Sequence, residues 1–168
     1  MNAGFTGLLL GLLAILLVVA AIIDVKTFTI SNGLNATVAL LAPLYWWSSG
    51  LPLWPDAAIQ FAVAAGVFVV LGATFYMGMM GGGDVKLAAA LALWFKPFVT
   101  LKFLVIMSLA GGLLTLVVLL LHKKRGKPPF DGDAPADAAA ARPEIPYGVA
   151  IAIGALWILA QRFLNQFA

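Results

Sequence analysis

Two aspartates stand at the ends of apolar stretches, where a carboxylate is costly. Asp84 follows three glycines in the segment Met77–Leu87, MGMMGGGDVKL, and Asp24 follows an apolar run that begins at Gly4. An ionised carboxylate costs about 2.5–3.5 kcal/mol at the centre of a membrane-spanning helix and less near the interface, so such a residue is a candidate for function. A plainer interpretation stays open, in which Asp84 only caps the helix that follows a flexible glycine turn.

A pair of carboxylates is the minimal apparatus for aspartic proteolysis. One carboxylate, ionised, activates a water molecule, while the other, protonated, polarises the scissile carbonyl. Two like charges in contact cannot both ionise cheaply, so the pair tends to hold one proton. The glycines before Asp84 would let backbone approach closely and would adopt conformations that other residues avoid. Nothing in the residues indicates which aspartate is the base and which is the acid.

The composition predicts an integral membrane protein. The chain of 168 residues is 63% hydrophobic and 10% charged, with a mean hydropathy of +1.05, values that a polytopic membrane protein requires and a soluble domain does not. It has no cysteine and one histidine, which argues against zinc sites and cysteine nucleophiles, so we expect no metal and no cofactor. The basic residues lie in short loops between apolar runs, which argues against nucleic-acid binding.

Six apolar stretches predict an all-α fold of transmembrane helices. The first lacks a basic segment before it and a small-residue cleavage site after it, so we expect it to be a retained helix and not a signal peptide. Lys96 and Pro97 interrupt the fourth. The stretches are Gly4–Ile23, Leu34–Trp47, Ala57–Met80, Leu87–Leu101, Phe103–Leu121 and Tyr147–Ala160.

The distribution of basic residues tests whether the fourth stretch crosses the membrane. If it crosses, seven basic residues lie on one side and three on the other, whereas without it the count is five against five. The positive-inside rule therefore favours six transmembrane helices, with the N and C termini outside and His122–Pro143 as a flexible cytoplasmic loop. This topology places Asp24 and Asp84 together at the cytoplasmic boundary. No internal repeat is visible, so we expect residues 1–168 to form a single membrane-embedded domain.

Three short blocks surround the two aspartates. They are Asp24 with Ile30 and Asn32, then Gly81–Leu87 (GGGDVKL), then Pro146-Tyr147-Gly148. In this order they resemble the Asp and I-P-N motif, the G-x-G-D-x-K-L signature and the P-x-G-P stretch of the type IV prepilin peptidases, which are membrane aspartic peptidases of the same broad G-x-G-D class as presenilin. The G-x-G-D motif alone is weak evidence for this family, but the three blocks in family order on a chain with six expected helices are specific for it.

The resemblance implies a function. It implies an endopeptidase that removes the basic leader peptide from type IV prepilins or pseudopilins at the cytoplasmic face of the bacterial inner membrane, cleaving after the leader's glycine. Asp24 and Asp84 would be the catalytic pair, and Gly81 and Gly83 would shape the turn that aims Asp84. The other residues carried over from the family motifs are Asn32, Lys86, Pro146 and Gly148.

Two of these residues have a plainer alternative. Lys86 matches the family lysine, but a lysine here could also be an anchor that extends its side chain to the membrane interface. Asn32 would either form a hydrogen bond near the site or cap a helix.

The sequence also departs from the family pattern. Ser31 stands where the family has proline, and Val149 replaces the second proline of the last motif. Many relatives carry a cytoplasmic methyltransferase insert with a four-cysteine zinc site, which this cysteine-free chain lacks. It is therefore similar to the short, peptidase-only form associated with tight-adherence (Flp-type) pili, and we expect no N-methyltransferase activity.

Two functions of other classes stay open. A small proton-coupled transporter would also use intramembrane carboxylates, but it needs them at mid-membrane depth, and both aspartates are expected at helix ends. A catalytically silent scaffold of a pilus or secretion complex would fit the same helices.

Overall fold

The computed structural model describes residues 3–124 and 145–165. These residues form six α-helices and one short π-helical segment, without any strand, which confirms the all-α prediction. The elements are α1 (Ala3–Thr27), α2 (Asn32–Ser49), η1 (Leu53–Ala57), α3 (Ala58–Tyr76), α4 (Gly82–Ala92), α5 (Pro97–Lys124) and α6 (Tyr147–Leu164).

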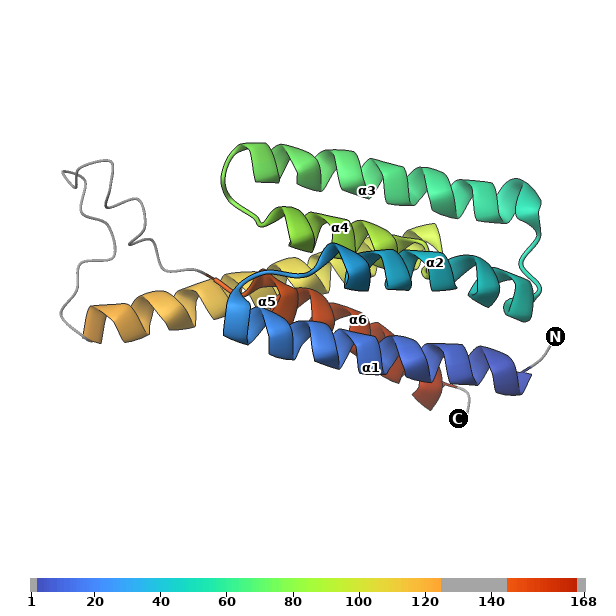
Figure 1. Cartoon of the computed structure of the whole chain (residues 1–168), viewed down its shortest axis with the longest axis horizontal. Coiled ribbons are helices and arrows are strands. Elements are labelled where there is room, and N and C mark those ends of the chain that lie inside the picture. The colour runs from blue at the N-terminus through green and yellow to red at the C-terminus, as the bar shows by residue number, and fades with distance from the viewer. Residues whose placement is uncertain (1–2, 125–144, 166–168) are drawn as a thin grey trace.

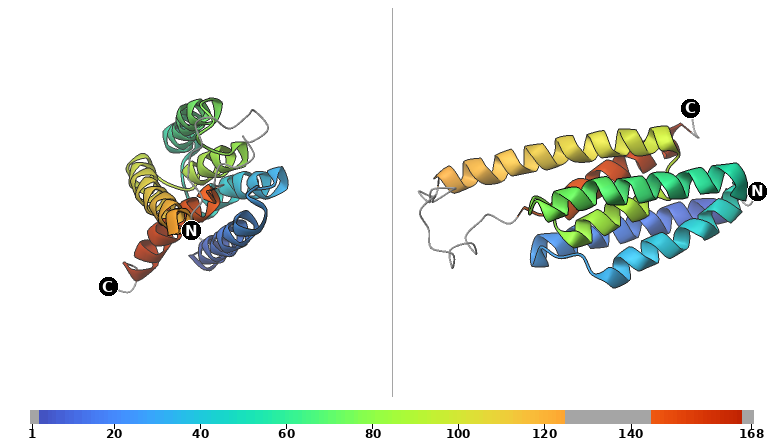
Figure 2. Two further views of the ribbon diagram at one scale, coloured as in Figure 1. Left: turned by 90° about the vertical axis from the view of Figure 1, so that its left-hand side faces the viewer. Right: turned by 90° about the horizontal axis from the view of Figure 1, so that it is seen from above.

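Successive helices run in opposite directions along one bundle (Figure 1). The ends of α1, α3 and α5 and the beginnings of α2, α4 and α6 gather at the same end, which we call the aspartate end because it holds Asp24 and Asp84. The beginning of α1 and the end of α6 lie at the opposite end. Figure 2 shows α5 extending beyond the other helices at the aspartate end. The alternation brings segments from the whole chain to one place.

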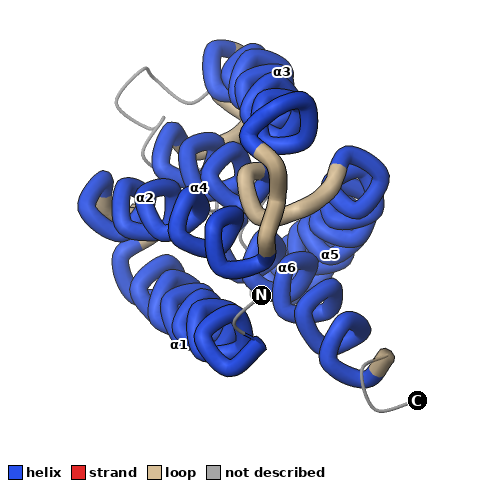
Figure 3. The backbone as a smooth tube through the Cα atoms, turned by 90° about the vertical axis from the view of Figure 1, so that its right-hand side faces the viewer, coloured by secondary structure: helices blue, strands red, loops and turns tan. Residues whose placement is uncertain are grey.

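The short helix α4 lies inside the bundle, where it contacts α2, α3 and α6 (Figure 3). Every residue from Asp84 to Ala92 is buried except Lys86. The alanines at 88–90 have small side chains, which allow the backbones of neighbouring helices to approach closely, as helix packing in lipid requires. A helix surrounded in this way positions its first turn firmly.

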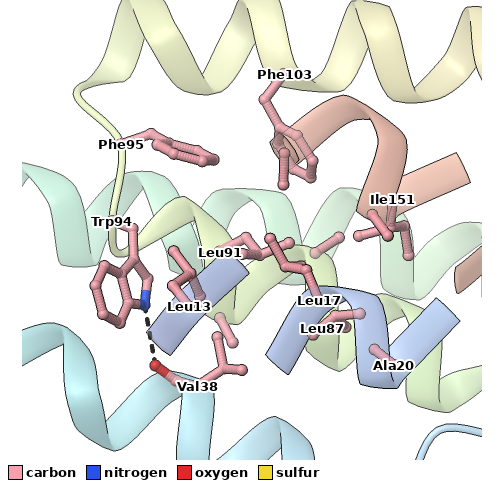
Figure 4. Close-up of a cluster of buried hydrophobic side chains, with 14 of the residues drawn as sticks. Leu13, Leu17, Ala20, Val38, Leu87, Leu91, Trp94, Phe95, Phe103 and Ile151 are labelled. Carbon is pink, nitrogen blue, oxygen red and sulfur yellow. Dashed lines mark hydrogen bonds between the residues drawn. The ribbon is translucent and has the colours of Figure 1, made fainter. Parts of the chain in front are cut away.

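The apolar core follows α4 toward the opposite end (Figure 4). Trp94, just after α4, is buried and donates a hydrogen bond from Nε1 to the backbone oxygen of Val38 in α2 at 3.0 Å. This bond ties the end of α4 to α2. The large buried side chains of this core include Leu13, Leu17, Leu87, Leu91, Phe103 and Ile151.

Four helical segments are long and apolar enough to cross a membrane, as expected for a membrane protein. They are Gly4–Thr27, Leu53–Tyr76, Pro97–Leu121 and Tyr147–Leu164. The helices α2 and α4 are not among them. α2 is less apolar than α1 and α3, and α4 has only 11 residues, about 16 Å at 1.5 Å per residue. The count of six crossings stays a prediction.

The stretch predicted at Leu87–Leu101 is divided between two helices. α4 ends at Ala92, and α5 begins at Pro97, so the interruption expected at Lys96 and Pro97 is confirmed, whereas the bounds expected for this stretch were wrong. Proline has no N–H to donate and its ring clashes with the preceding turn, so it is favoured in the first turn of a helix and is costly farther inside one. At the other end of α5, residues 122–124 of the expected loop are helical, and 125–144 lie outside the described residues.

Candidate active site

Asp24 lies in the last turn of α1, and its side chain is only 2% exposed. The backbone N–H groups of Gly148 and Val149, the second and third residues of α6, lie next to its carboxylate and stabilise its charged form, while the Val149 N–H also donates to the backbone oxygen of Pro146 at 3.2 Å. The first residues of a helix have N–H groups without intrahelical partners and carry partial positive charge. No side chain of α6 itself caps that end. Asp24 therefore does from another helix what an N-cap side chain does.

Gly148 is required by this contact. A Cβ at position 148 would lie 2.8 Å from Cγ and Oδ2 of Asp24 and 2.7 Å from Cδ1 of Ile30. Any larger residue would push the start of α6 away from the carboxylate. The end of α1 and the start of α6 thus meet through a glycine.

Asp84 is the third residue of α4 and is 7% exposed. Its carboxylate accepts a hydrogen bond from the backbone N–H of Gly81, the N-cap residue, which is one half of a capping box. The plain interpretation of Asp84 as a cap is thus correct as geometry. Capping is not the only interaction of Asp84, because Asp24 lies close enough for its charge to act on the Asp84 carboxylate.

The two buried carboxylates each keep a free oxygen. Oδ2 of Asp24 and Oδ1 of Asp84 have no hydrogen-bond partner among the described residues. A buried polar atom without a partner costs about 1–3 kcal/mol, and more when it is charged. Two buried carboxylates that feel each other's charge favour a state with a single negative charge. The arrangement can therefore hold a proton on one side and attract a water molecule on the other.

Ile30 lies between the segments that carry the aspartates. A Cβ on Gly83 would lie 2.7 Å from the backbone oxygen of Ile30, and Gly148 meets the end of the same side chain. The chain reaches this position because Phe28, directly after α1, adopts a left-handed conformation with φ of 51°. We infer that Ile30, quoted above only as a motif residue, spaces the start of α4 from the start of α6.

The glycine triplet Gly81–Gly83 serves close approach and not unusual conformation. Gly81 has φ of −70° and ψ of 143°, which any residue adopts, and the positive-φ glycines of the described chain are Gly50 and Gly78. The expectation that the triplet adopts conformations closed to other residues was therefore wrong. Gly83 is needed because the backbone of Ile30 passes directly against it.

Lys86 and Asn32 contact each other. Nζ of Lys86 donates to Oδ1 of Asn32 at 2.8 Å, which joins α4 to the first residue of α2. Asn32 does not cap α2, since the cap is Ser31, whose Oγ accepts from the N–H of Leu34 at 3.3 Å. The serine that departs from the family pattern thus makes a contact that proline cannot.

Asn35 is a site residue that the sequence reasoning missed. It is 5% exposed, and its Nδ2 donates to the backbone oxygen of Gly83 at 2.9 Å, while its Oδ1 has no hydrogen-bond partner in the described chain. It therefore holds the glycine segment next to Asp84. The available signal was a polar amide within an apolar stretch expected to cross the membrane.

All the residues predicted for the site lie at the aspartate end. They are Asp24, Asn32, Gly81, Gly83, Asp84, Lys86, Pro146 and Gly148. A groove of about 490 Å³ begins beside them, lined at this end by Asn32, Asn35 and Lys86 and farther along by apolar residues of α2, α3 and α4, among them several alanines together with Phe61 and Phe68. The site thus adjoins an open apolar groove along the bundle.

Comparison with known proteins gave one match. The model of the type IV leader peptidase family matches residues 11–116. That range includes both aspartates and the glycine triplet and ends before Pro146. No curated protein and no solved structure matches the chain.

Proposed function

The chain belongs to the type IV leader peptidase family, and from this premise we propose that it is a membrane aspartic endopeptidase whose catalytic groups are Asp24 and Asp84. The substrate we propose is a type IV prepilin or pseudopilin, from which the enzyme removes the basic leader. The observation that carries the proposal is the meeting of two buried carboxylates from different helices, each with one oxygen free for water or substrate.

The N–H groups at each carboxylate support an assignment of roles. Asp24 lies beside two N–H groups at a helix start, and donors of this kind favour the ionised form. Asp84 accepts a hydrogen bond from one N–H group, and it faces the charge of Asp24. We therefore assign Asp24 as the base and Asp84 as the acid.

The proposed reaction has two steps. Asp24 takes a proton from water as the water oxygen attacks the scissile carbonyl carbon, and Asp84 gives its proton to the carbonyl oxygen. The resulting diol then collapses. The C–N bond breaks, Asp24 passes its proton to the leaving amine, and Asp84 recovers a proton from the diol hydroxyl.

We propose six transmembrane helices with both termini outside and the aspartate end at the cytoplasmic face of the bacterial inner membrane. The seven-to-three division of basic residues supports this orientation. The alternating directions of the helices are compatible with it. Because α4 is surrounded by protein, it need not match the lipid thickness as an exposed helix must.

The proposal excludes N-methylation by this chain. No cysteine is available for the zinc site of the methyltransferase insert. Purified protein is expected to cleave a prepilin without S-adenosylmethionine and to leave the new N-terminus unmethylated. Mass spectrometry of the product measures this directly.

The decisive experiment is cleavage of a co-expressed prepilin by Asp→Asn variants. Asparagine keeps the shape of aspartate and caps helices as well, so Asp24→Asn and Asp84→Asn should fold. Each is expected to lower the cleavage rate by about 10²- to 10⁴-fold, and the double variant by little more, since groups that act as a unit are not additive. Asp56→Asn, an exposed acid in η1 at the opposite end, is the matched control and should cleave normally.

The same experiment separates the other functions. Substantial cleavage by either single variant at normal membrane level would mean that cleavage does not depend on the aspartate pair of this chain. The silent scaffold or the transporter would then be the favoured function. The position of both aspartates at helix ends argues against a transporter, which needs carboxylates at mid-membrane depth.

A further inference from the structure

A polar cavity lies at the end of the bundle away from the aspartates, the end that faces the viewer in Figure 3. It measures about 640 Å³ and is lined by three basic side chains, Lys96, Lys102 and Arg162. No carboxylate is among the described residues that line it. We call it the cationic cavity. A hollow with charge of one sign attracts ligands of the opposite sign.

The cations in this cavity are held by neutral groups. The Arg162 guanidinium donates a hydrogen bond to the Tyr45 hydroxyl and lies 5.4 Å from the centre of the Tyr45 ring. Nζ of Lys102 lies 4.9 Å from the centre of the Phe98 ring. Contacts with aromatic rings orient a cation but leave its full charge in place.

A buried amide also lines the cationic cavity. Gln60 in α3 is 4% exposed, and its Oε1 has no hydrogen-bond partner among the described residues. An orphaned buried acceptor in a native structure calls for an explanation. A ligand that carries a hydroxyl group would supply the missing donor.

An apolar groove adjoins the cationic cavity. It measures about 700 Å³, lies between α1 and α6, and shares Ser49, Leu159 and Arg162 with the cavity. Gly7 and Gly11 line it, and a Cβ at either position would meet nothing within 4 Å. We call it the glycine groove. The charged space thus continues into a groove lined mainly by apolar residues of α1 and α6.

We propose that the cationic cavity and the glycine groove together bind one anionic phospholipid with a hydroxyl-bearing head group. The phosphate lies among Lys96, Lys102 and Arg162, a head-group hydroxyl donates to Oε1 of Gln60, and an acyl chain follows the glycine groove. Three basic side chains with no carboxylate beside them in the described lining suit an anionic head group. A free phosphate has no acyl chain and would leave the glycine groove empty, whereas a phospholipid would occupy both the cavity and the groove.

The test uses the full chain, purified and stripped of lipid in a neutral detergent. Phosphatidylglycerol, phosphatidylcholine and glycerol 3-phosphate are added separately, and bound molecules are measured by native mass spectrometry alongside the melting temperature. Only phosphatidylglycerol should be retained and should raise the melting temperature. Equal retention of phosphatidylcholine would overturn the proposal, as would equal stabilisation by glycerol 3-phosphate.

Two variants probe the two parts separately. Lys102→Gln should weaken phosphatidylglycerol binding about fivefold, the usual effect of one basic residue near an anionic lipid. Gly11→Leu fills the groove without changing charge, and since the space there is open it should fold and yet lose the lipid. Lys26→Gln removes a charge at the aspartate end and serves as the control. Undiminished binding by Gly11→Leu, or an equal loss in Lys26→Gln, would contradict the proposal.

Discussion

Replacing Gly148 by alanine is the most direct test of how the site is positioned. The new methyl would lie 2.8 Å from Oδ2 of Asp24 and 2.7 Å from Cδ1 of Ile30, where ordinary contacts are 3.4–4 Å. The groups must therefore separate by about 0.6–1.3 Å, the difference between those distances. A displacement of about 1 Å at a reacting group can cost about 10²-fold in rate.

The assay is the single-turnover rate of leader removal by purified Gly148→Ala with a prepilin in liposomes. We expect a rate about 10²-fold below that of the unchanged protein, because the Asp24 carboxylate either turns away from the N–H groups at the start of α6 or moves with the end of α1 relative to Asp84. Protein level and melting temperature are measured together with the rate, so that loss of folding is not mistaken for loss of chemistry.

Two further variants make the result interpretable. Gly33→Ala, near the start of α2, adds the same methyl where nothing lies within 4 Å, and it should cleave at the normal rate. Ile30→Val removes Cδ1, so combined with Gly148→Ala it should relieve one of the two clashes and recover part of the activity. A normal rate in Gly148→Ala at normal protein level would refute the view that this glycine positions Asp24.

Three other predictions concern the Asn35 hydrogen bond, the backbone of Phe28 and the membrane orientation. Asn35→Leu leaves the backbone oxygen of Gly83 without its donor, so the melting temperature in detergent should fall by about 2–4 °C, and an unchanged value would refute a holding role. Phe28→Gly removes the penalty of a left-handed conformation at an exposed residue, so unfolding should become about 1 kcal/mol less favourable, and a lower melting temperature would contradict this. A reporter active only in the cytoplasm should work when fused after Lys127 and fail after Ser49, and activity after Ser49 would reverse the proposed orientation.

The convergence of the aspartates could be predicted because it depends only on the number of crossings. Two helices separate Asp24 from Asp84, so any alternating bundle returns both to the same end. The boundary at Pro97 was partly visible, since the sequence showed an interruption there. What the sequence did not show is that the interruption ends one helix and begins the next.

The contacts that hold the carboxylates could not be predicted in the same way. The donors to Asp24 are backbone N–H groups of α6, and every residue except proline has one, so residue type carries no signal. The reason for the glycine triplet was also hidden, because the close approach of Ile30 to Gly83 depends on tertiary packing. Asn35 was the exception, since a lone amide in an apolar stretch is visible in the sequence.

The N–H group of Val149 beside Asp24 gives meaning to a departure from the family pattern. Where the family motif has proline, the ring nitrogen has no hydrogen to give. Here valine supplies that hydrogen, and the carboxylate has one more donor than the motif alone would provide. The substitution thus exchanges a rigid ring at the start of α6 for an N–H group that can act on the Asp24 carboxylate. Under the proposed mechanism, position 149 would influence the charge state of Asp24 without a change in either proposed catalytic residue.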